Sequence, residues 1–334
     1  MLAYPSSALL LQSAPAGDGQ TVLYLVIIIV MIALFGGAAE LINRGTEKLE
    51  EVVGQGMAGG VILGFMSSLP ELIFVLIAIG KGSTEVALGS AIGGNIILFT
   101  FGMGMVGITY FMKWRSPLRM KEDYRIEVFF LFIANLSLMA LLMYGRLDAV
   151  SGVLLLAIYV AYLLYRYLKV HERVVTHART REGRRLIMHG AAYFTVGIAV
   201  VVLLSDEFIK YILAVSGALG ISALFLSIVI TPIAADLPEQ LSAYRLSVSS
   251  RGGGSTALVG FIGSKLQNNT VLLGAIGLLS ATAVKTSAAF TEFALVIIIN
   301  FIAIAAIYHG RLTRRNGMVL VLLYFVAIAS AFTL

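Results

Sequence analysis

Apolar runs of membrane-spanning length recur along the chain, separated by short charged or glycine-rich breaks. A helix that crosses a bilayer takes about 20 residues, and the runs predict ten such helices. Their expected bounds are 21–42, 57–79, 86–112, 126–144, 149–168, 187–204, 220–247, 256–280, 290–308 and 317–333. The first and the sixth are expected to continue past the membrane, through LINRGTEKLEE and SDEFIKYILAVSG. The pattern therefore predicts an all-α polytopic membrane protein.

The ten predicted helices divide into two groups of five around a short basic segment. The expected division is a tail at 1–20, a first repeat at 21–168, a basic loop at 169–186 and a second repeat at 187–334. Because five is odd, the second group would cross the membrane in the opposite direction, as an inverted repeat. Leu-Pro-Glu recurs at an offset of 168, and Gly-Ser-Thr follows it in both groups. Asn135 and Asn300 lie at mid-span, where we expect them to form hydrogen bonds between helices.

Lys and Arg residues are distributed unevenly between the two sides of this arrangement. Nineteen, Arg166 among them, would lie on one side. The other side would hold only Lys81, Arg146, Lys210 and Lys285. Since cytoplasmic loops carry the excess of basic residues, we expect a multi-pass protein of the cell membrane with both termini outside and the loop 169–186 in the cytoplasm. We interpret that loop as a topology signal, with binding of anionic lipid as the alternative.

Composition narrows the range of functions. Hydrophobic residues make up 59% of the 334 residues and charged residues 13%, which is typical of a chain whose partner is the lipid bilayer. The net charge of +6 follows from the topology signal, so no nucleic-acid partner is expected, and no obligate protein partner is evident. The absence of cysteine excludes disulfides and thiolate sites. The first twenty residues lack the basic segment of a signal peptide, and whether they are processed stays open.

Two of the apolar runs are interrupted by a proline beside a glutamate. Pro70 and Glu71 lie in the second predicted helix. Pro238 and Glu239 lie in the seventh, with Asp236 three residues before Glu239. A carboxylate at mid-span costs roughly 3 kcal/mol, and a proline removes a backbone donor and so frees carbonyl oxygens. Because broken helices at matching positions of two repeats indicate the central ion site of a transporter, we expect a cation site here.

Both predicted half-sites offer oxygen ligands. A hard divalent cation such as calcium takes about six to eight oxygens from carboxylates, carbonyls and water. Glycine-rich polar segments in the third and eighth helices would approach the acids closely, and acids three residues apart face the same way on a helix. No cofactor is expected, because the ions bound are the transported ones. The residues expected to ligate them are Glu71, Glu239, Asp236, Ser67, Ser68, Asn95, Ser264 and Asn268.

The motifs around these acids resemble those of the calcium/cation antiporter superfamily. Residues 66–71, Met-Ser-Ser-Leu-Pro-Glu, take the place of the first signature of sodium/calcium exchangers, Gly-Thr-Ser-x-Pro-Glu. Residues 89–95 match their second signature, and residues 263–268, Gly-Ser-Lys-Leu-Gln-Asn, follow the second signature of proton/calcium exchangers. The resemblance implies a five-plus-five arrangement of ten helices. It also implies alternating access, in which the first and sixth helices shift across a fixed core.

The chain departs from sodium/calcium exchangers at several ligand positions. Gly94 stands where they have a ligating serine, and Leu98 where they have an asparagine. Ala235 and Asp236 replace a threonine and a serine of the second repeat. Asn268 stands where many members have a further acid. These differences keep three acids in the expected site but remove hydroxyl groups suited to sodium.

Lys265 is a basic residue inside the glycine-rich motif of the eighth predicted helix. We expect its side chain to extend to the cytoplasmic face, because that helix begins only nine residues earlier. The alternative is that Lys265 is a built-in cation that neutralises one acid when the site is empty.

These features predict a secondary active antiporter that exchanges calcium for sodium by alternating access, and not an enzyme. The alternative is a proton-coupled exchanger of calcium or another divalent cation, because three acids crowded at low dielectric favour taking up a proton. An intramembrane hydrolase that uses Asp236 with Glu71 or Glu239 is disfavoured, because no GxGD element or nucleophile–histidine set accompanies these acids. A passive channel fits broken inverted repeats less well.

Overall fold

Helices make up almost all of the regular structure in the part of the chain that the structure describes. The computed structural model describes residues 18–53, 65–66, 68–120, 124–169 and 181–332. Its α-helices are α2 (Asp18–Val53), α4 (Leu69–Gly80), α5 (Thr84–Ile97), α6 (Met103–Trp114), α7 (Arg125–Tyr144), α8 (Ala149–Lys169), α9 (Arg181–Leu219), α10 (Ala223–Ala235), α11 (Leu237–Ser249), α12 (Gly253–Gln267), α13 (Leu273–Leu279), α14 (Phe290–Ile307) and α15 (Arg314–Phe332). The predicted all-α class is confirmed.

The remaining elements are short. Two π-helical turns, η1 (Leu98–Gly102) and η3 (Asn268–Leu272), join α5 to α6 and α12 to α13, and a 3₁₀ turn, η4 (Thr286–Ala289), precedes α14. Four strands of two residues each are β1 (Leu118–Arg119), β2 (Arg146–Leu147), β3 (Val284–Lys285) and β4 (Arg311–Leu312). The hydrophobic pattern does not predict these strands, because two residues are too few to show an alternation.

Each of the ten predicted spans overlaps a described helical segment, although residues 57–64 and 67 of the second span lie outside the described residues. Seven segments are long and apolar enough to cross a membrane on their own, and α10 with α11 forms an eighth that is bent by 51°. The other two are the 12-residue α4 and the run α12–η3–α13. Large apolar side chains such as Ile29 and Leu203 are 65% and 75% exposed on the outer helices, which is where lipid would contact them. The chain is a multi-pass membrane protein.

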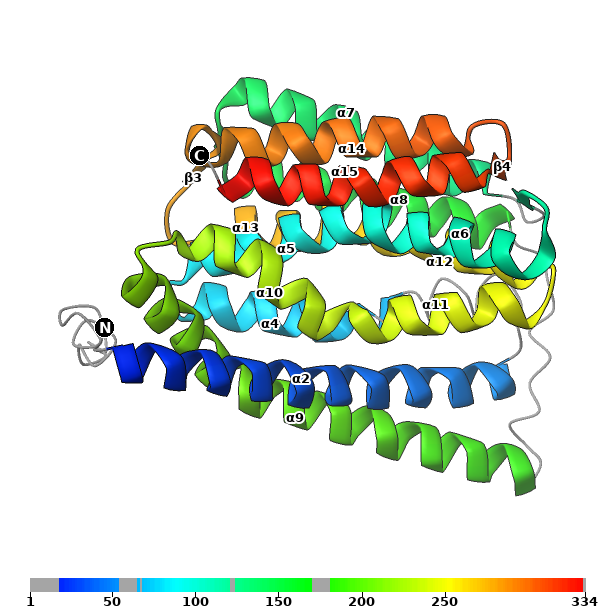
Figure 1. Ribbon diagram of the computed structural model, residues 1–334, viewed down its shortest axis with the longest axis horizontal. Coiled ribbons are helices and arrows are strands. Elements are labelled where there is room, and N and C mark those ends of the chain that lie inside the picture. Colours follow the sequence, from blue (N-terminus) through cyan, green and yellow to red (C-terminus); the bar gives the residue numbers. More distant parts are fainter. Residues whose placement is uncertain (1–17, 54–64, 67, 121–123, 170–180, 333–334) are drawn as a thin grey trace.

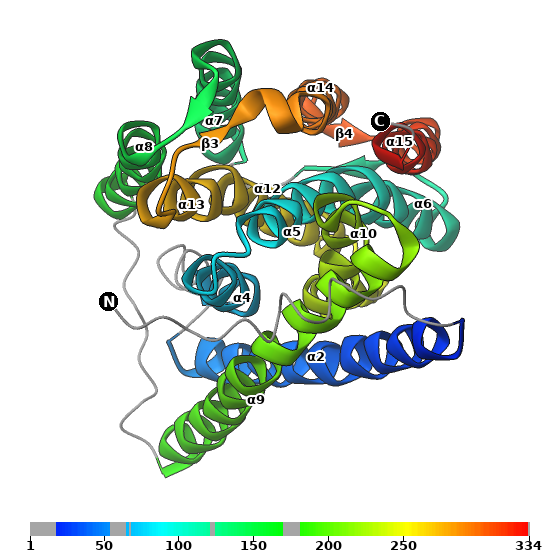
Figure 2. The ribbon, with the colours of Figure 1, turned by 90° about the vertical axis from the view of Figure 1, so that its left-hand side faces the viewer.

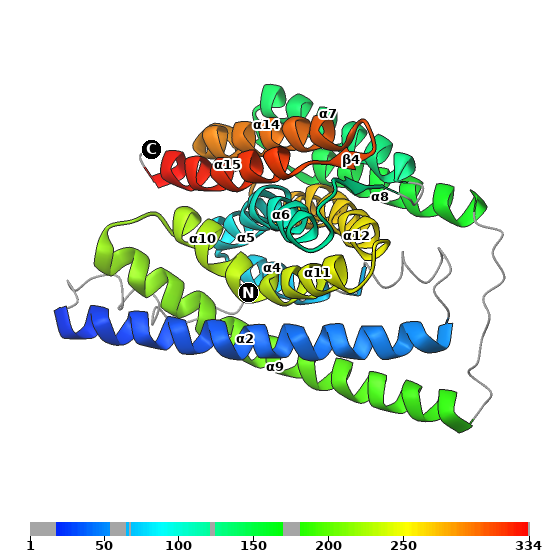
Figure 3. The ribbon, with the colours of Figure 1, turned by 45° about the vertical axis from the view of Figure 1, so that its right-hand side comes forward.

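The helices are arranged in layers with their axes roughly aligned (Figure 1). Seen from the end, α2 and α9 form one outer layer, and α7, α8, α14 and α15 form the other (Figure 2). The middle is made by α4, α5, α6, α10, α11, α12 and α13. The long helices α2 and α9 pack along each other and run in opposite directions (Figure 3). The helices that carry the predicted site residues therefore lie between two helical layers.

Matching elements of the two halves are related as an inverted repeat requires. The π-helices η1 and η3 begin at Leu98 and Asn268, at the same place in each half. Strand β1 of the first half pairs with β4 of the second, and β2 pairs with β3, at opposite ends of the molecule (Figure 1). Asn300 Nδ2 donates to Asn135 Oδ1 at 2.8 Å, so the expected hydrogen bond between these helices is confirmed.

Basic residues from distant parts of the chain meet at the two ends of the molecule. The pair β1–β4 places Arg119 opposite Arg311 at one end, and β2–β3 places Arg146 opposite Lys285 at the other. Helix α2 begins and α15 ends at the same end of the molecule as β3 (Figure 1). Arg166 is buried and forms a 2.5 Å ion pair with Glu127.

Candidate cation site

Two helix breaks position the acids of the predicted site. Helix α4 begins at Leu69 and α11 begins at Leu237, so that Pro70 and Pro238 lie in a first helical turn. A proline is tolerated there because the first amides of a helix have no partner in the helix. Glu71 and Glu239 follow directly, where the positive end of the helix dipole favours a carboxylate. Pro238 therefore starts the second part of the bent pair α10–α11, with the break before it, and Pro70 stands at the start of α4.

Side chains from three elements converge on Gly94 in α5. A methyl group added to Gly94 would lie 2.6 Å from Glu71 Oε1, 2.8 Å from Asn268 Nδ2 and 3.0 Å from Asp236 Oδ2. Glu71 comes from α4, Asn268 from η3, and Asp236 from the junction between α10 and α11. Two acids from different repeats thus lie beside one glycine, and the missing side chain of Gly94 leaves the room for them.

Several oxygens at this convergence are buried without a hydrogen-bond donor among the described residues. They are Oε1 of Glu71, Oδ2 of Asp236, Oδ1 of Asn268 and Oδ1 of Asn95. Buried polar atoms in native proteins are nearly always paired, so such atoms suit a ligand that accepts electron pairs. Carboxylate and amide oxygens together are the donor set of a hard cation. The residues therefore match the chemistry of a transported cation as substrate.

Glu239 and Ser264 form a separate pair in this conformation. Ser264 Oγ donates to Glu239 Oε1 at 2.7 Å, and the Glu239 side chain is only partly buried. Within the described part of the chain, no group of three or more Asp, Glu, His or Cys residues is close enough to hold a metal ion. Glu71 and Asp236 are therefore the acids that the structure brings together, while Glu239 lies to one side.

The other predicted ligands contact the backbone or lie outside the described residues. Asn95 Nδ2 donates to the carbonyl of Ala91 at 2.8 Å, and Ser68 Oγ donates to that of Phe65 at 3.4 Å. Both Asn95 and Ser68 are buried. Ser67 lies outside the described residues.

Lys265 does not extend to a membrane face, so that expectation is wrong. Its side chain is 0% exposed, its Nζ donates to the carbonyl of Asn95, and it lies 5.1 Å from the centre of the Phe99 ring. Lys265 is the thirteenth residue of α12, which places it about 18 Å along the helix axis at 1.5 Å per residue. A lysine side chain is too short to reach past that depth.

A second proline in the seventh span was missed by the sequence reasoning. Pro232 lies inside α10, so the carbonyl of Ile228 loses its usual helical donor. That carbonyl lies against Gly93 of α5, where an added methyl group would clash with it. The same helix thus presents this carbonyl to the helix that carries Gly94. The sequence signal was the spacing of Pro232 and Pro238 by six residues.

Two further buried polar residues, each next to a predicted ligand in the chain, were not predicted. Gln240 accepts a hydrogen bond from Tyr244 at 3.0 Å, while its Nε2 has no partner among the described residues. Both side-chain amide atoms of Asn269 are also buried and unpaired in the described part of the chain. The signal for both was a polar residue beside a predicted ligand in an apolar run.

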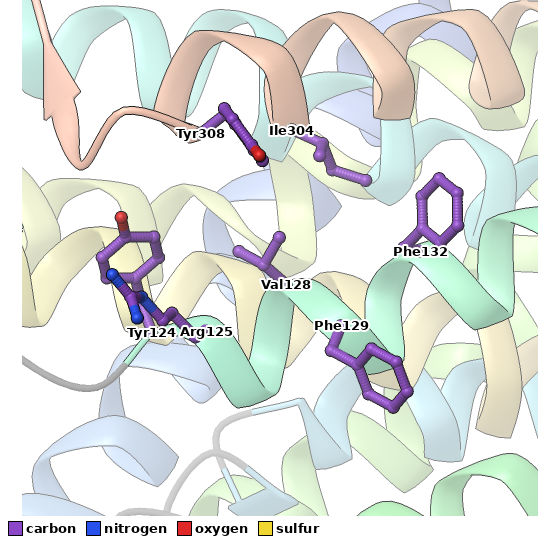
Figure 4. A pocket seen from close by; sticks show the side chains of 7 residues that line it. All are labelled: Tyr124, Arg125, Val128, Phe129, Phe132, Ile304 and Tyr308. Atoms are coloured by element: carbon purple, nitrogen blue, oxygen red, sulfur yellow. The ribbon is translucent and has the colours of Figure 1, made fainter.

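A groove on the surface of the molecule lies apart from these residues. It has a volume of about 730 Å³ and runs between α7 and α14, as Figure 4 shows. Its lining is Tyr124, Arg125, Val128, Phe129, Phe132, Ile304 and Tyr308. None of the predicted ligands lines it, so it is not the cation site.

Comparison with known proteins identifies relatives for about three quarters of the chain or more. The chain is 23% identical to the inner membrane protein YrbG of Escherichia coli K12 over 253 residues, which is 73% of this chain and 75% of that protein. It is 20% identical over 274 residues to an uncharacterized membrane protein of Methanocaldococcus jannaschii, which covers 81% of this chain and 85% of that protein. Both alignments are distant but long.

Two kinds of solved exchanger share the fold. The H+/Ca2+ exchanger CAX superposes with a TM-score of 0.77 at 18% identity, over 93% of this chain and 86% of that one. The sodium-calcium exchanger NCX_Mj, soaked with Na+ and Ca2+, superposes with a TM-score of 0.65 at 18% identity, over 92% of this chain and 98% of that one. At this identity the likeness establishes the fold.

A family model gives the assignment that these distant likenesses cannot give alone. The model described as sodium/calcium exchanger protein matches residues 23–168 and 189–333, one segment in each half. Members of this family are membrane transporters of cations and not enzymes. Because the two matched segments cover most of its length, the chain belongs to the sodium/calcium exchanger protein family.

Proposed function

We propose that this protein is a secondary active antiporter that exchanges calcium for sodium at a single site between its two repeats. One observation carries the proposal: Glu71 of the first repeat and Asp236 of the second meet at Gly94 together with Asn268. Acids from both repeats at one point in the middle layer are the arrangement expected for a central transport site.

Calcium is the substrate that these ligands suit best. It accepts carboxylates, amide oxygens and water in an irregular shell. Glu71 and Asp236 offer two carboxylates, and Asn268 and Asn95 offer amide oxygens without a donor among the described residues. Glu239 is the third carboxylate, and a rotation away from Ser264 would bring it to the ion.

Alternating access requires a layer that moves across the site, and α2 with α9 is the layer we propose. Phe35 of α2, Phe74 of α4 and Phe208 of α9 pack with ring centroids 5.6 to 5.8 Å apart. All three rings are buried. Apolar ring contacts have no fixed hydrogen-bond partners, so they can slide and re-form at low energetic cost. Phe74 lies three residues after Glu71, which couples this contact to the site.

Sodium is the coupling ion we propose, on the basis of Leu-Pro-Glu in both repeats and the neutral oxygens of Ser68, Ser264 and Asn268. Protons are the second candidate, and one observation favours them. Glu71 and Asp236 are both buried at 3% and 5% exposure and lie beside the same glycine. Two carboxylates so close at low dielectric repel each other, which favours a proton on one of them.

We further propose that the chain lies in the cell membrane with both termini outside and the loop 169–186 in the cytoplasm. The end of the molecule formed by β1 and β4 carries Arg119 and Arg311, and helix α9, whose first residues belong to the basic loop, begins at that end (Figure 1). A relative of similar length bears the name inner membrane protein.

Uptake of radioactive calcium into proteoliposomes tests the function and the coupling ion together. One set of vesicles carries an outward sodium gradient at equal pH, and the other a pH gradient in sodium-free choline buffer. We expect uptake in the first set only. Uptake driven by the pH gradient alone would replace sodium by protons, and no uptake under either gradient would contradict the exchange of calcium.

A further inference from the structure

Lys265 places a positive charge among the acids of the site. It is fully buried, and its Nζ contacts the carbonyl oxygen of Asn95 and the face of the Phe99 ring. A carbonyl oxygen and an aromatic face both attract cations. Lys265 follows Ser264, which donates to Glu239. It contacts Asn95, the residue after Gly94, where Glu71 and Asp236 meet. The surroundings of the ammonium are therefore those of a bound monovalent cation.

The position of Lys265 in its repeat strengthens this reading. The π-helices η1 and η3 begin three residues after Asn95 and Lys265 respectively. Lys265 therefore occupies in the second repeat the place that Asn95 has in the first. Its Nζ reaches across the boundary between the repeats to the main chain of that equivalent residue. The first repeat thus has the neutral amide of Asn95 at this position, and the second repeat has the cationic side chain of Lys265.

The charge of the whole site follows from its members. Glu71, Asp236 and Glu239 contribute three negative charges, and Lys265 contributes one positive charge. A net charge of minus two is balanced by one divalent cation or by two monovalent cations. The hydroxyl and amide groups missing at Gly94 and Leu98 agree with this, because fewer neutral oxygens remain for additional monovalent ions.

We propose that Lys265 is a tethered cation that takes the place of one transported monovalent ion, so that one calcium exchanges for two monovalent cations without net charge movement. The inference rests on the proposed exchange of calcium. It adds the stoichiometry and the residue that sets it, and it holds whether sodium or protons drive uptake.

The calcium gradient at equilibrium in proteoliposomes measures this stoichiometry directly. For the wild type, a tenfold gradient of the driving ion should sustain a calcium gradient of about 100-fold, since each ion exchanged contributes one tenfold step. The gradient should not change when the membrane potential is clamped at different values with potassium and valinomycin. For Lys265→Asn, the same gradient should sustain about 1,000-fold at zero potential, and inside-negative potential should lower it.

Three variants separate the charge of Lys265 from its packing. Lys265→Gln also removes the charge, so it should share the voltage dependence of Lys265→Asn, whereas Lys265→Arg keeps the charge and should remain independent of voltage. Lys285→Asn removes an exposed lysine of β3 and should behave as the wild type. The wild-type measurement stands on its own if the buried variants do not fold.

The outcomes distinguish the two proposals. Ion-driven uptake with a voltage-dependent calcium gradient in the wild type would overturn the tethered cation and leave the exchange of calcium in place. A voltage-independent gradient in both the wild type and Lys265→Asn would show that Lys265 does not set the stoichiometry. Absence of ion-driven uptake would overturn both.

Discussion

The two repeats place their helix breaks and π-helices at matching positions but fill them with different side chains. The first repeat contributes one acid, Glu71, the expected neutral ligands Ser67, Ser68 and Asn95, and two residues without polar side chains, Gly94 and Leu98. The second repeat contributes Asp236, Glu239, Ser264, Lys265 and Asn268. The backbone of the site is therefore nearly symmetric, whereas its charged side chains lie mostly in the second repeat.

In this duplicated fold, equivalent positions of the two repeats have different roles: one leaves space for ligands, and the other carries a ligand. Gly94 provides room, since any side chain there would meet Glu71, Asp236 and Asn268. The equivalent residue of the second repeat, Ser264, binds Glu239. Gly94 of the first repeat thus leaves the space in which Glu71, Asp236 and Asn268 gather, and changes in the two halves should have different consequences.

Loss of an acid in either repeat should have the largest effect. Glu71→Gln and Glu239→Gln should each reduce exchange by at least about 100-fold, because removing one partner of a buried charged group costs about 3 to 5 kcal/mol. Calcium uptake into proteoliposomes measures this, with folding checked by size-exclusion chromatography in detergent. Glu85→Gln, at an exposed position of α5, is the matched control. Normal calcium flux from either site variant would remove that residue from the site.

Moving the acid from position 236 to position 268 of the second repeat should have the next largest effect on transport. If Asp236 replaces an acid that relatives carry on the eighth helix, Asp236→Ser with Asn268→Asp should transport at least about tenfold better than Asp236→Ser alone, the equivalent of about 1.4 kcal/mol. The reason is that Asp236 and Asn268 approach the same point beside Gly94. Equal uptake by the two variants at equal expression would count against the relocation of the acid.

Filling the space beside Gly94 in the first repeat should have a moderate effect on calcium affinity. Gly94→Ala places a methyl group 2.6 Å from Glu71 Oε1, and overpacking of this kind costs about 1 to 3 kcal/mol. Calcium affinity should fall by about tenfold, as measured by isothermal titration. Gly260→Ala in α12 is the control, because no atom lies within 4 Å of the added methyl group. Unchanged affinity in Gly94→Ala would place the ion elsewhere.

Removing the hydrogen bond between Asn135 and Asn300 should have the smallest effect, and it should change stability and not transport. A double-mutant cycle with Asn135→Ala and Asn300→Ala should give a coupling energy of about 0.6 kcal/mol, the typical value for such bonds in membrane proteins. Thermal unfolding in detergent measures it, and calcium uptake should remain unchanged. A coupling near zero would mean that the bond does not hold α7 against α14.

The sequence was sufficient to predict the ten spans, the inverted repeat and the acids at the helix breaks. Apolar length and the recurrence of Leu-Pro-Glu carry that information, because both are local in the chain. The place of Asn135 and Asn300 at mid-span also predicted their contact. The meeting of Glu71 with Asp236 beside Gly94 could be expected as an ion site, but its geometry depends on how four elements pack.

Lys265 and Arg166 show why the remaining features could not be predicted. Arg166 was assigned to the cytoplasmic side from its charge, and Lys265 from its distance to the start of its helix; neither argument predicted that the side chain is buried. Arg166 is paired with Glu127, which lies 39 positions away in the sequence, and Lys265 contacts the main chain of the other repeat. The positive-inside rule treats basic residues independently and does not include such partners. Depth in the membrane therefore follows from packing.

Equilibrium binding of radioactive calcium to the purified protein tests the central claim most directly, because it counts sites. If acids of both repeats make one site, the wild type binds one calcium per chain, and Glu71→Gln and Glu239→Gln each abolish that binding. Two calcium ions per chain in the wild type, with one lost in each variant, would contradict the shared site and assign a separate site to each repeat.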